Sequence, residues 1–494
     1  MAVVPGRDDK TDPRFYVGVP KFDDEPTDGG PRAPAKPAAI VASPPRQRTQ
    51  PRAVVPPRFF PAPPRTLDEA GMTPSALEAA VLKAIFFAGE LRGIDVASRL
   101  CLPPQLVEPA LEQLRRQKLI DIRGGSGQGF GLSTMIYVTT ALSREPLGQL
   151  LDRNRYNGPA PVPYGDWVRA VRAQSIRGVR VTRQMLTRRL DGLVVRDAIF
   201  DGLGPAMNSG RAIFFHGPPG NGKTAICQRM ASCYSWDVFI PYAVEVDGFV
   251  VKVFDEVIHH PVAARDGDPP RSPTASTAGG AQVQAGAVPI DERWVRCQRP
   301  LVVVGGELTL DMLDMSYSPE VKFYEAPLQM KAANGVLLID DFGRQRVSPR
   351  ELLNRWIVPL ENDVDYLQLA TGKKFSIPFD AFLVFSTNLN PADLVDDAFL
   401  RRVRYKLKVE APDEAMYKAI FRAQCAAKGL AYSEAAVDSL LRVQLLGAGR
   451  PLAACQPRDL VEQVMDHAIY QGETPALTAE ALARAAGTYF AQFG

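Results

Sequence analysis

The chain has 494 residues, of which 46% are hydrophobic and 23% charged, and its formal net charge is +3. This composition fits a globular protein with two or three domains, and the near-neutral charge does not indicate nucleic acid or membrane as a bulk partner. The six cysteines form no CxxC pair and there are only four histidines, so neither a zinc site nor a disulfide framework is expected. Neither a secretory signal nor a membrane-length apolar segment is visible, so we expect a cytoplasmic protein.

Residues 1–66 are rich in proline, arginine and alanine and contain few large apolar residues. Such a segment buries too little apolar surface to offset the entropy lost on ordering, so it predicts a disordered tail. Its proline-rich stretch, 44–64, could dock a partner, but an inert tether is the simpler interpretation.

Residues 67–145 predict a compact domain. Thr73 is an N-cap candidate for an apolar helix, a second short helix covers about 94–100, and two prolines at 103–104 open a third. Two short strands around a glycine-rich tip, 124–131, complete the pattern. Three helices followed by a hairpin resemble the winged-helix fold.

Winged helices can bind DNA through basic residues of the third helix. Here that helix carries Glu108 and Glu112 beside Arg115 and Arg116, and the glutamates would face phosphate unfavourably. We therefore favour protein docking over DNA binding for this domain. The arginine-rich segment 146–209 predicts a helical linker, either a solvated face or a contact with another subunit, with nucleic-acid binding as the less favoured alternative.

An apolar strand at 211–216 leads directly into a glycine-rich loop of the pattern G-x-x-x-x-G-K-[ST]. Glycines let backbone N–H groups turn inward around phosphates, and the helix that follows adds the positive end of its dipole. We expect Lys223 to reach the β- and γ-phosphates of ATP and Thr224 to ligate Mg²⁺. The loop residues are Gly217, Pro218, Pro219, Gly220, Asn221, Gly222, Lys223 and Thr224.

Two further apolar strands end in polar residues. The strand 336–339 precedes Asp340 and Asp341, and the strand 381–385 precedes Ser386-Thr387-Asn388. We expect Asp340 near Mg²⁺, Asp341 to position the attacking water, and Asn388 to hold that water opposite the γ-phosphate. Aspartate is shorter than the commoner glutamate at position 341, so hydrolysis could be slow.

Three arginines complete the candidate site. Arg401 and Arg402 end a predicted helix and could present a guanidinium to the γ-phosphate in an adjacent subunit, where such an arginine accelerates the reaction by roughly 10³–10⁵. Arg458 follows a proline at the first turn of another helix and could place a cation over the bound nucleotide.

This ordered set of motifs resembles the AAA+ ATPases, in which the corresponding residues are called sensor 1 (Asn388), arginine finger (Arg402, with Arg401 as the alternate) and sensor 2 (Arg458). The stretch 326–340 and the expected hairpin around Thr371-Gly372 resemble the MoxR and magnesium-chelatase branch. The resemblance implies a P-loop doubly wound parallel sheet with a C-terminal helical lid.

The implied domains are an α/β nucleotide-binding domain at 210–411, interrupted by a disordered insertion at 262–290, and a lid at 412–494. Two extra strands, at 244–253 and 294–297, depart from the family pattern. Their presence leaves the pairing of the strands open.

Three functions compete. We favour a ring-forming homo-oligomer that hydrolyses ATP at subunit interfaces to remodel or assemble a protein client, as a chaperone does. A slow nucleotide-dependent switch or adaptor and a DNA-associated ATPase are the alternatives.

Overall fold

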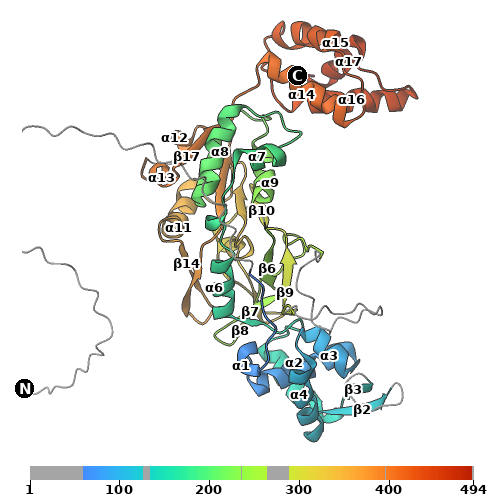
Figure 1. Ribbon diagram of the computed structural model, residues 1–494, viewed down its shortest axis with the longest axis vertical. Coiled ribbons are helices and arrows are strands. Elements are labelled where there is room, and N and C mark those ends of the chain that lie inside the picture. Colours follow the sequence, from blue (N-terminus) through green and yellow to red (C-terminus); the bar gives the residue numbers. More distant parts are fainter. Residues whose placement is uncertain (1–58, 126–133, 235, 264–288, 395–396, 492–494) are drawn as a thin grey trace, which may run out of the picture. The chain divides into compact units, whose positions relative to one another are not determined.

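The computed structural model describes residues 59–125, 134–234, 236–263, 289–394 and 397–491 (Figure 1). The expected tail up to residue 58, the tip of the glycine-rich turn and most of the expected insertion lie outside these residues. Part of the range 59–66, which we expected in the tail, is packed instead: Pro61 and Pro64 are buried, and Phe59 and Phe60 are half-buried. Phe59 contacts Phe239 and Trp294 edge-on, with ring centroids 6.3 and 6.0 Å away, and Phe60 also contacts Phe239. Two adjacent aromatic side chains supply the buried surface that the rest of the tail lacks.

The N-terminal domain contains the expected three helices and hairpin, preceded by one more helical turn. Thr73 caps the first long helix, where its side chain accepts a hydrogen bond from the N–H of Ala76. The strands form one antiparallel sheet in the order β1-β3-β2. The elements are α1 (Leu67–Ala70), α2 (Pro74–Ala88), β1 (Glu90–Arg92), α3 (Gly93–Leu100), α4 (Pro104–Arg116), β2 (Ile120–Gly125) and β3 (Met135–Thr139).

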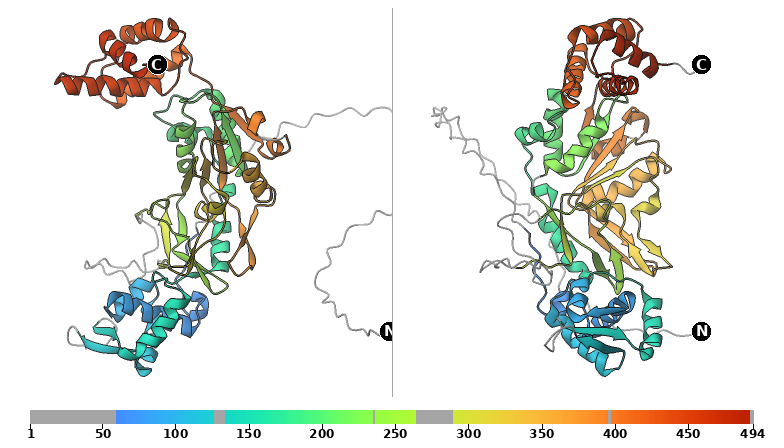
Figure 2. Two further views of the ribbon diagram at one scale, coloured as in Figure 1. Left: turned by 180° about the vertical axis from the view of Figure 1, so that it is seen from behind. Right: turned by 90° about the vertical axis from the view of Figure 1, so that its right-hand side faces the viewer.

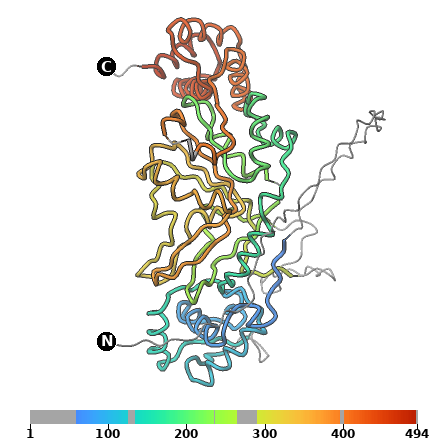
Figure 3. Tube along the Cα trace, turned by 90° about the vertical axis from the view of Figure 1, so that its left-hand side faces the viewer, coloured from blue at the N-terminus to red at the C-terminus, as the bar shows by residue number. Residues whose placement is uncertain are grey.

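The segment 146–209 is helical for most of its length, but it is no separate linker. Val162 pairs with Val244 in a sheet, and Trp167 and Val171 are buried in the same core as that sheet. Most arginines of the segment, including Arg180, Arg183 and Arg188, are exposed, while the apolar residues between them pack inward. The elements are α5 (Arg144–Arg153), β4 (Val162–Pro163), α6 (Tyr164–Ala173), α7 (Arg183–Arg189) and α8 (Asp197–Ser209), and Figure 3 follows their path.

The main sheet has five parallel strands in the order β10-β13-β16-β5-β17. The first strand in the chain, β5, lies between the two last, so a crevice forms beyond the carboxyl ends of β5 and β16, where open parallel sheets bind ligands. The bounds are β5 (Ala212–His216), β10 (Leu301–Val304), β13 (Val336–Ile339), β16 (Phe382–Thr387) and β17 (Tyr405–Lys408).

Both faces of this sheet are covered. In β5, Ile213 and Phe215 pack with α8 and α9 (Lys223–Cys233), whereas Ala212 and Phe214 pack with α11 (Pro349–Asn362) on the other face (Figure 1). Because successive side chains of a strand point to opposite faces, a strand buried on both faces is apolar throughout. The structure therefore has a mixed α/β fold with a doubly covered parallel sheet.

The extra strands form additional sheets. One has the order β11-β12-β8-β7-β4, and β6 pairs antiparallel with β9. The expected hairpin around Thr371-Gly372 is present as β14 and β15. The bounds are β6 (Val238–Pro241), β7 (Ala243–Val246), β8 (Phe249–Lys252), β9 (Trp294–Cys297), β11 (Ser316–Ser318), β12 (Phe323–Glu325), β14 (Val364–Gln368) and β15 (Lys374–Pro378).

The C-terminal helices gather into one bundle with a core of their own (Figure 2). Its centre includes Tyr417, Phe421 and Leu460. Among the described residues, no helix is both long and apolar enough to span a membrane. The remaining helices are α10 (Leu328–Lys331), α12 (Pro391–Leu394), α13 (Asp397–Arg402), α14 (Glu414–Ala427), α15 (Glu434–Ser439), a π-helix (Leu440–Leu446), α16 (Gln456–Gln471) and α17 (Ala479–Tyr489).

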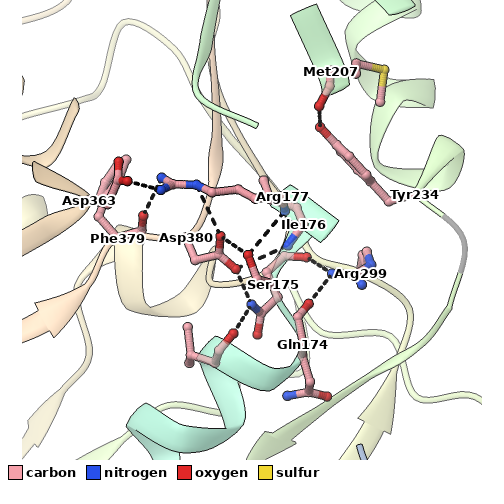
Figure 4. Close-up of polar contacts among 12 residues, drawn as sticks. Gln174, Ser175, Ile176, Arg177, Met207, Tyr234, Arg299, Asp363, Phe379 and Asp380 are labelled. Carbon is pink, nitrogen blue, oxygen red and sulfur yellow. Dashed lines mark hydrogen bonds and ion pairs between the residues drawn. The ribbon is translucent and has the colours of Figure 1, made fainter. Parts of the chain in front are cut away.

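A buried polar cluster lies where the strands of the main sheet begin (Figure 4). Asp380, just before β16, accepts hydrogen bonds from Ser175 Oγ, at 2.9 Å, and from Asn334 Nδ2, at 2.5 Å. Arg299, just before β10, donates to the carbonyl oxygens of Gln174 and Asn334, at 3.0 and 2.7 Å. We call these residues, with Arg177, the Asp380 cluster. It fixes the end of α6 against the main sheet.

Candidate functional site

The loop between β5 and α9 has the backbone conformation that its glycines permit. Gly217, Gly220 and Gly222 have φ angles of 136°, 74° and 84°, a region that side chains disfavour. A Cβ atom on Gly217 would lie 2.2 Å from the carbonyl oxygen of Val409. The fold therefore requires glycine at position 217, because any other residue would have an unfavourable φ angle and its Cβ atom would clash with Val409.

Lys223, the first residue of α9, folds back over this loop. Its Nζ donates hydrogen bonds to the carbonyl oxygens of Gly217 and Pro218, at 2.8 and 2.9 Å, and to Oδ1 of Asn388, at 2.6 Å. Three acceptors match the three hydrogens of an ammonium group. Burial lowers the pKa of Lys223, and the negative charges of Asp340 and Asp341 oppose that shift.

Thr224 and Asp340 are hydrogen-bonded to each other in the site. Thr224 Oγ1 donates to Asp340 Oδ2 at 2.7 Å, although the two residues are 116 positions apart. A hydroxyl beside one carboxylate fits Mg²⁺, which keeps several waters and is usually held by one or two carboxylates together with substrate phosphates. Among the described residues, no group of three or more His, Cys, Asp or Glu side chains could hold a metal without such a substrate.

Asp341 and Asn388 form the next pair. Asn388 Nδ2 donates to Asp341 Oδ1 at 2.9 Å, so Asn388 links Asp341 to Lys223. Asp341 has a φ of 47°, which is uncommon for residues other than glycine. Gln345 holds this backbone, because its Nε2 donates to the carbonyl oxygens of Asp340 and Asp341 at 2.9 and 3.2 Å. Asn388 thus orients the exposed carboxylate of Asp341, while Gln345 holds its backbone.

The loop before α16 is hydrogen-bonded to the glycine-rich loop. The N–H of Ala454 donates to Asn221 Oδ1 at 3.1 Å, and the N–H of Cys455 donates to the carbonyl oxygen of Gly220 at 2.8 Å. A Cβ atom on Gly220 would lie 2.6 Å from Cys455 Sγ. A change in the conformation of either loop is therefore transmitted to the other.

These elements enclose a cavity of about 550 Å³, within the size range of small-molecule sites. Its apolar walls include Leu193, Val194 and Val195, from the segment before α8, and Ile420, from α14. Sequence reasoning missed these residues. The apolar run 193–195 within an arginine-rich segment was the available signal. The predicted residues that line the cavity are Pro219, Gly220, Asn221, Gly222, Lys223, Thr224, Asp340, Asp341, Asn388 and Arg458.

The other predicted residues lie elsewhere. Gly217 and Pro218 contribute carbonyl oxygens that hold Lys223 and do not line the cavity. Arg401 and Arg402 do not line it either, and Nε of Arg402 lies 2.6 Å from Glu361 Oε1. Arg458 lines the cavity, but its guanidinium pairs with Asp459 at 2.8 Å and its side chain is 58% exposed.

Comparisons with known proteins give little further information. A family model described as a domain of unknown function (DUF8689) matches residues 413–488, the C-terminal helices. No curated protein matches. Similar solved structures include NtrX from Brucella abortus, with 14% identity, a TM-score of 0.35, and coverage of 62% of this chain and 58% of that one. They also include a RuvB mutant from Thermotoga maritima, with 13% identity, a TM-score of 0.31, and coverage of 64% and 72%. TM-scores of this size do not establish a common fold.

Proposed function

We propose that the chain binds MgATP in the cavity at the carboxyl ends of β5, β13 and β16 and hydrolyses it, as an ATPase of the AAA+ type. The observation that carries the proposal is the contact between Thr224 Oγ1 and Asp340 Oδ2. It brings the hydroxyl of the glycine-rich loop and the carboxylate of a neighbouring strand to one point, beside the ammonium of Lys223. A triphosphate with its magnesium is the ligand that needs all three groups together.

Each residue has a defined part in this proposal. Lys223 neutralises phosphate charge, while Thr224 and Asp340 hold the magnesium ion, which supplies Lewis-acid stabilisation of the charge on the phosphates when it is bound. Asp341, oriented by Asn388 and Gln345, holds and polarises the attacking water. The apolar segment 193–195 and Ile420 pack against the base.

Binding is tested first. A fluorescent ATP analogue is titrated into the full chain with Mg²⁺ and then with excess EDTA. We expect saturable binding that ATP competes away and that weakens without the metal. Release of phosphate from ATP is measured next. A chain that binds no nucleotide under these conditions contradicts the proposal.

We further propose that the active form is a ring-shaped homo-oligomer. Arg401 and Arg402, at the end of α13, do not line the cavity of their own subunit. This is what is expected of an arginine that contacts the nucleotide bound in a neighbouring subunit. ATP turnover per subunit is then expected to rise with protein concentration. Subunits with Arg402→Ala mixed with subunits with Lys223→Met should regain part of the activity that each lacks alone. No gain on mixing contradicts action in trans.

We favour a role in which ATP hydrolysis drives the remodelling or assembly of a protein client. A slow nucleotide-dependent switch is the second candidate, supported by the bond that engages Asp341 with Asn388. The two differ in rate: a remodeller turns over about once per second or faster, whereas a switch remains loaded for minutes. A pull-down with the Asp341→Asn variant, which should retain ATP, would identify what stays bound. Exposed Glu108 and Glu112 on α4 do not favour DNA as that partner.

A further inference from the structure

A second cavity, of about 730 Å³, lies beside α2. The N-terminal half of α2 forms one wall, the end of α5 and the segment 153–161 form another, and the turn between β7 and β8 closes it together with Lys322. Backbone and aromatic contacts hold these walls: the N–H of Arg155 donates to the carbonyl oxygen of Val321 at 2.9 Å, and Tyr156 meets Phe323 edge-on. None of these residues belongs to the nucleotide site.

The wall contains a buried lysine whose partners are all neutral. Lys83 is 7% exposed, and its Nζ donates to Asn154 Oδ1 at 2.8 Å and to the carbonyl oxygen of Asn154 at 3.4 Å. Within the described part of the chain it has no ion pair. Burial lowers its pKa to about 8. A buried ammonium without a carboxylate is unfavourable, and buried charges are normally paired.

The other charged residues of the wall do not supply a partner for Lys83. Arg153 and Lys322 are cations, and the one carboxylate in the wall, Glu245, accepts a hydrogen bond from the N–H of Gly248. Lys322 pairs with Asp152 at 3.0 Å. The first turn of α2 also faces the cavity, which favours negative charge. The apolar part of the wall includes Met72, Ala76, Ala79, Ala80, Leu150 and Phe249.

We infer that this cavity binds a small amphipathic carboxylate, whose charged group pairs with Lys83 and whose apolar body packs against the alanines of α2 and Phe249. The carboxylate supplies the counter-charge that the fold omits. The volume suits a single small molecule, because ligand cavities generally measure about 300–1,000 Å³. Nothing in this inference depends on the nucleotide site.

Octanoate is the probe, and octylammonium and octanol, which share its chain, are the comparison compounds. Each is titrated into the full chain by calorimetry. We expect octanoate to bind and octylammonium not to, with octanol at least 10-fold weaker than octanoate. Lys83→Met, which keeps the length of the side chain and removes the charge, should weaken octanoate at least 10-fold.

Two further variants make the result specific. Ala79→Leu fills the cavity without changing charge and should also weaken octanoate, so the test stands even if Lys83→Met fails to fold. Lys118→Met removes an exposed lysine of the same domain that does not line the cavity and should bind octanoate as the unaltered chain does. The inference is overturned if octanoate does not bind at millimolar concentration, if octylammonium binds as well, or if Ala79→Leu leaves binding unchanged.

Discussion

The two edges of the main sheet carry the same residue types with opposite consequences. Asp340 follows β13 at the edge where the strands end; it bonds to Thr224 and lines a cavity. Asp380 precedes β16 at the edge where the strands begin; it is 7% exposed and is surrounded by donors of the chain itself (Figure 4). A carboxylate that is hydrogen-bonded only to groups of the chain stabilises the fold, whereas a carboxylate that lines a cavity is available to bind a ligand. Substitutions at these positions separate the two roles.

Asp380→Ala should have the largest effect, and on stability. It removes the acceptor of Ser175 Oγ, of the Ile176 N–H and of one Asn334 N–H. Arg177 loses one of its two carboxylate partners and keeps Asp363. Breaking a buried charged network costs about 3–5 kcal/mol, measured as the shift in the urea unfolding curve. Asp466→Ala removes an exposed carboxylate of α16 and should change little. Equal effects of the two variants would contradict the role of the Asp380 cluster.

Asp341→Asn should leave stability and ATP binding nearly unchanged and lower turnover by about 100-fold or more, the usual contribution of a positioned acid–base group. The amide keeps an acceptor for Asn388 but is a poor base. Phosphate release and nucleotide affinity are measured on the same preparation. Asp393→Asn, an exposed carboxylate on α12, is the control. If the Asp341→Asn variant hydrolyses ATP at the rate of the unaltered chain, Asp341 does not position the attacking water.

Lys223→Met should weaken ATP binding by about 10- to 100-fold, because a hydrogen bond to a charged group contributes roughly 1.5–3 kcal/mol. Titration of a fluorescent ATP analogue measures the effect. Lys374→Met, which replaces an exposed lysine at the start of β15, should bind as the unaltered chain does. If both variants bind ATP normally, the nucleotide site has been assigned incorrectly.

Lys83 represents a third case, a buried charge without a carboxylate, and its effect depends on pH. Burial lowers its pKa to about 8 from an ordinary 10.5. Between these values the unfolded chain binds more protons than the folded one, so stability rises with pH. Relative to Lys83→Met, the unaltered chain should gain about 3 kcal/mol from pH 7.5 to 10.5. Unfolding midpoints across this range test the gain, and a flat difference would contradict it.

Asn221→Ala should have the smallest effect. It removes the hydrogen bond from Ala454 to the glycine-rich loop, which contributes about 1 kcal/mol, or roughly 5-fold in affinity for ATP. The same titration detects it. An affinity equal to that of the unaltered chain would mean that this bond does not couple the two loops.

Much of the site could be predicted from the sequence. The glycine spacing of 217–224, the two acids after one apolar strand and Asn388 after another are local patterns, and the structure places Lys223, Thr224, Asp340, Asp341 and Asn388 around one cavity. Carboxyl ends of parallel strands meet at one edge of a sheet, so residues at those ends can be grouped without knowing the fold. The helices of the N-terminal domain followed from caps and periodicity, and the hairpin, expected at 366–378, from alternation around Thr371-Gly372.

What only the tertiary structure decided depends on packing between distant segments. Residues 193–195 and Ile420 line the cavity because the segment before α8 and the helix α14 lie beside the glycine-rich loop, and no spacing in the sequence encodes that placement. The same holds for Val162, which joins a strand more than 80 positions away, and for Asp380 and Lys83, whose burial depends on the elements that cover them. A local pattern specifies conformation and chemistry, whereas burial and long-range pairing come from the packing of the whole chain.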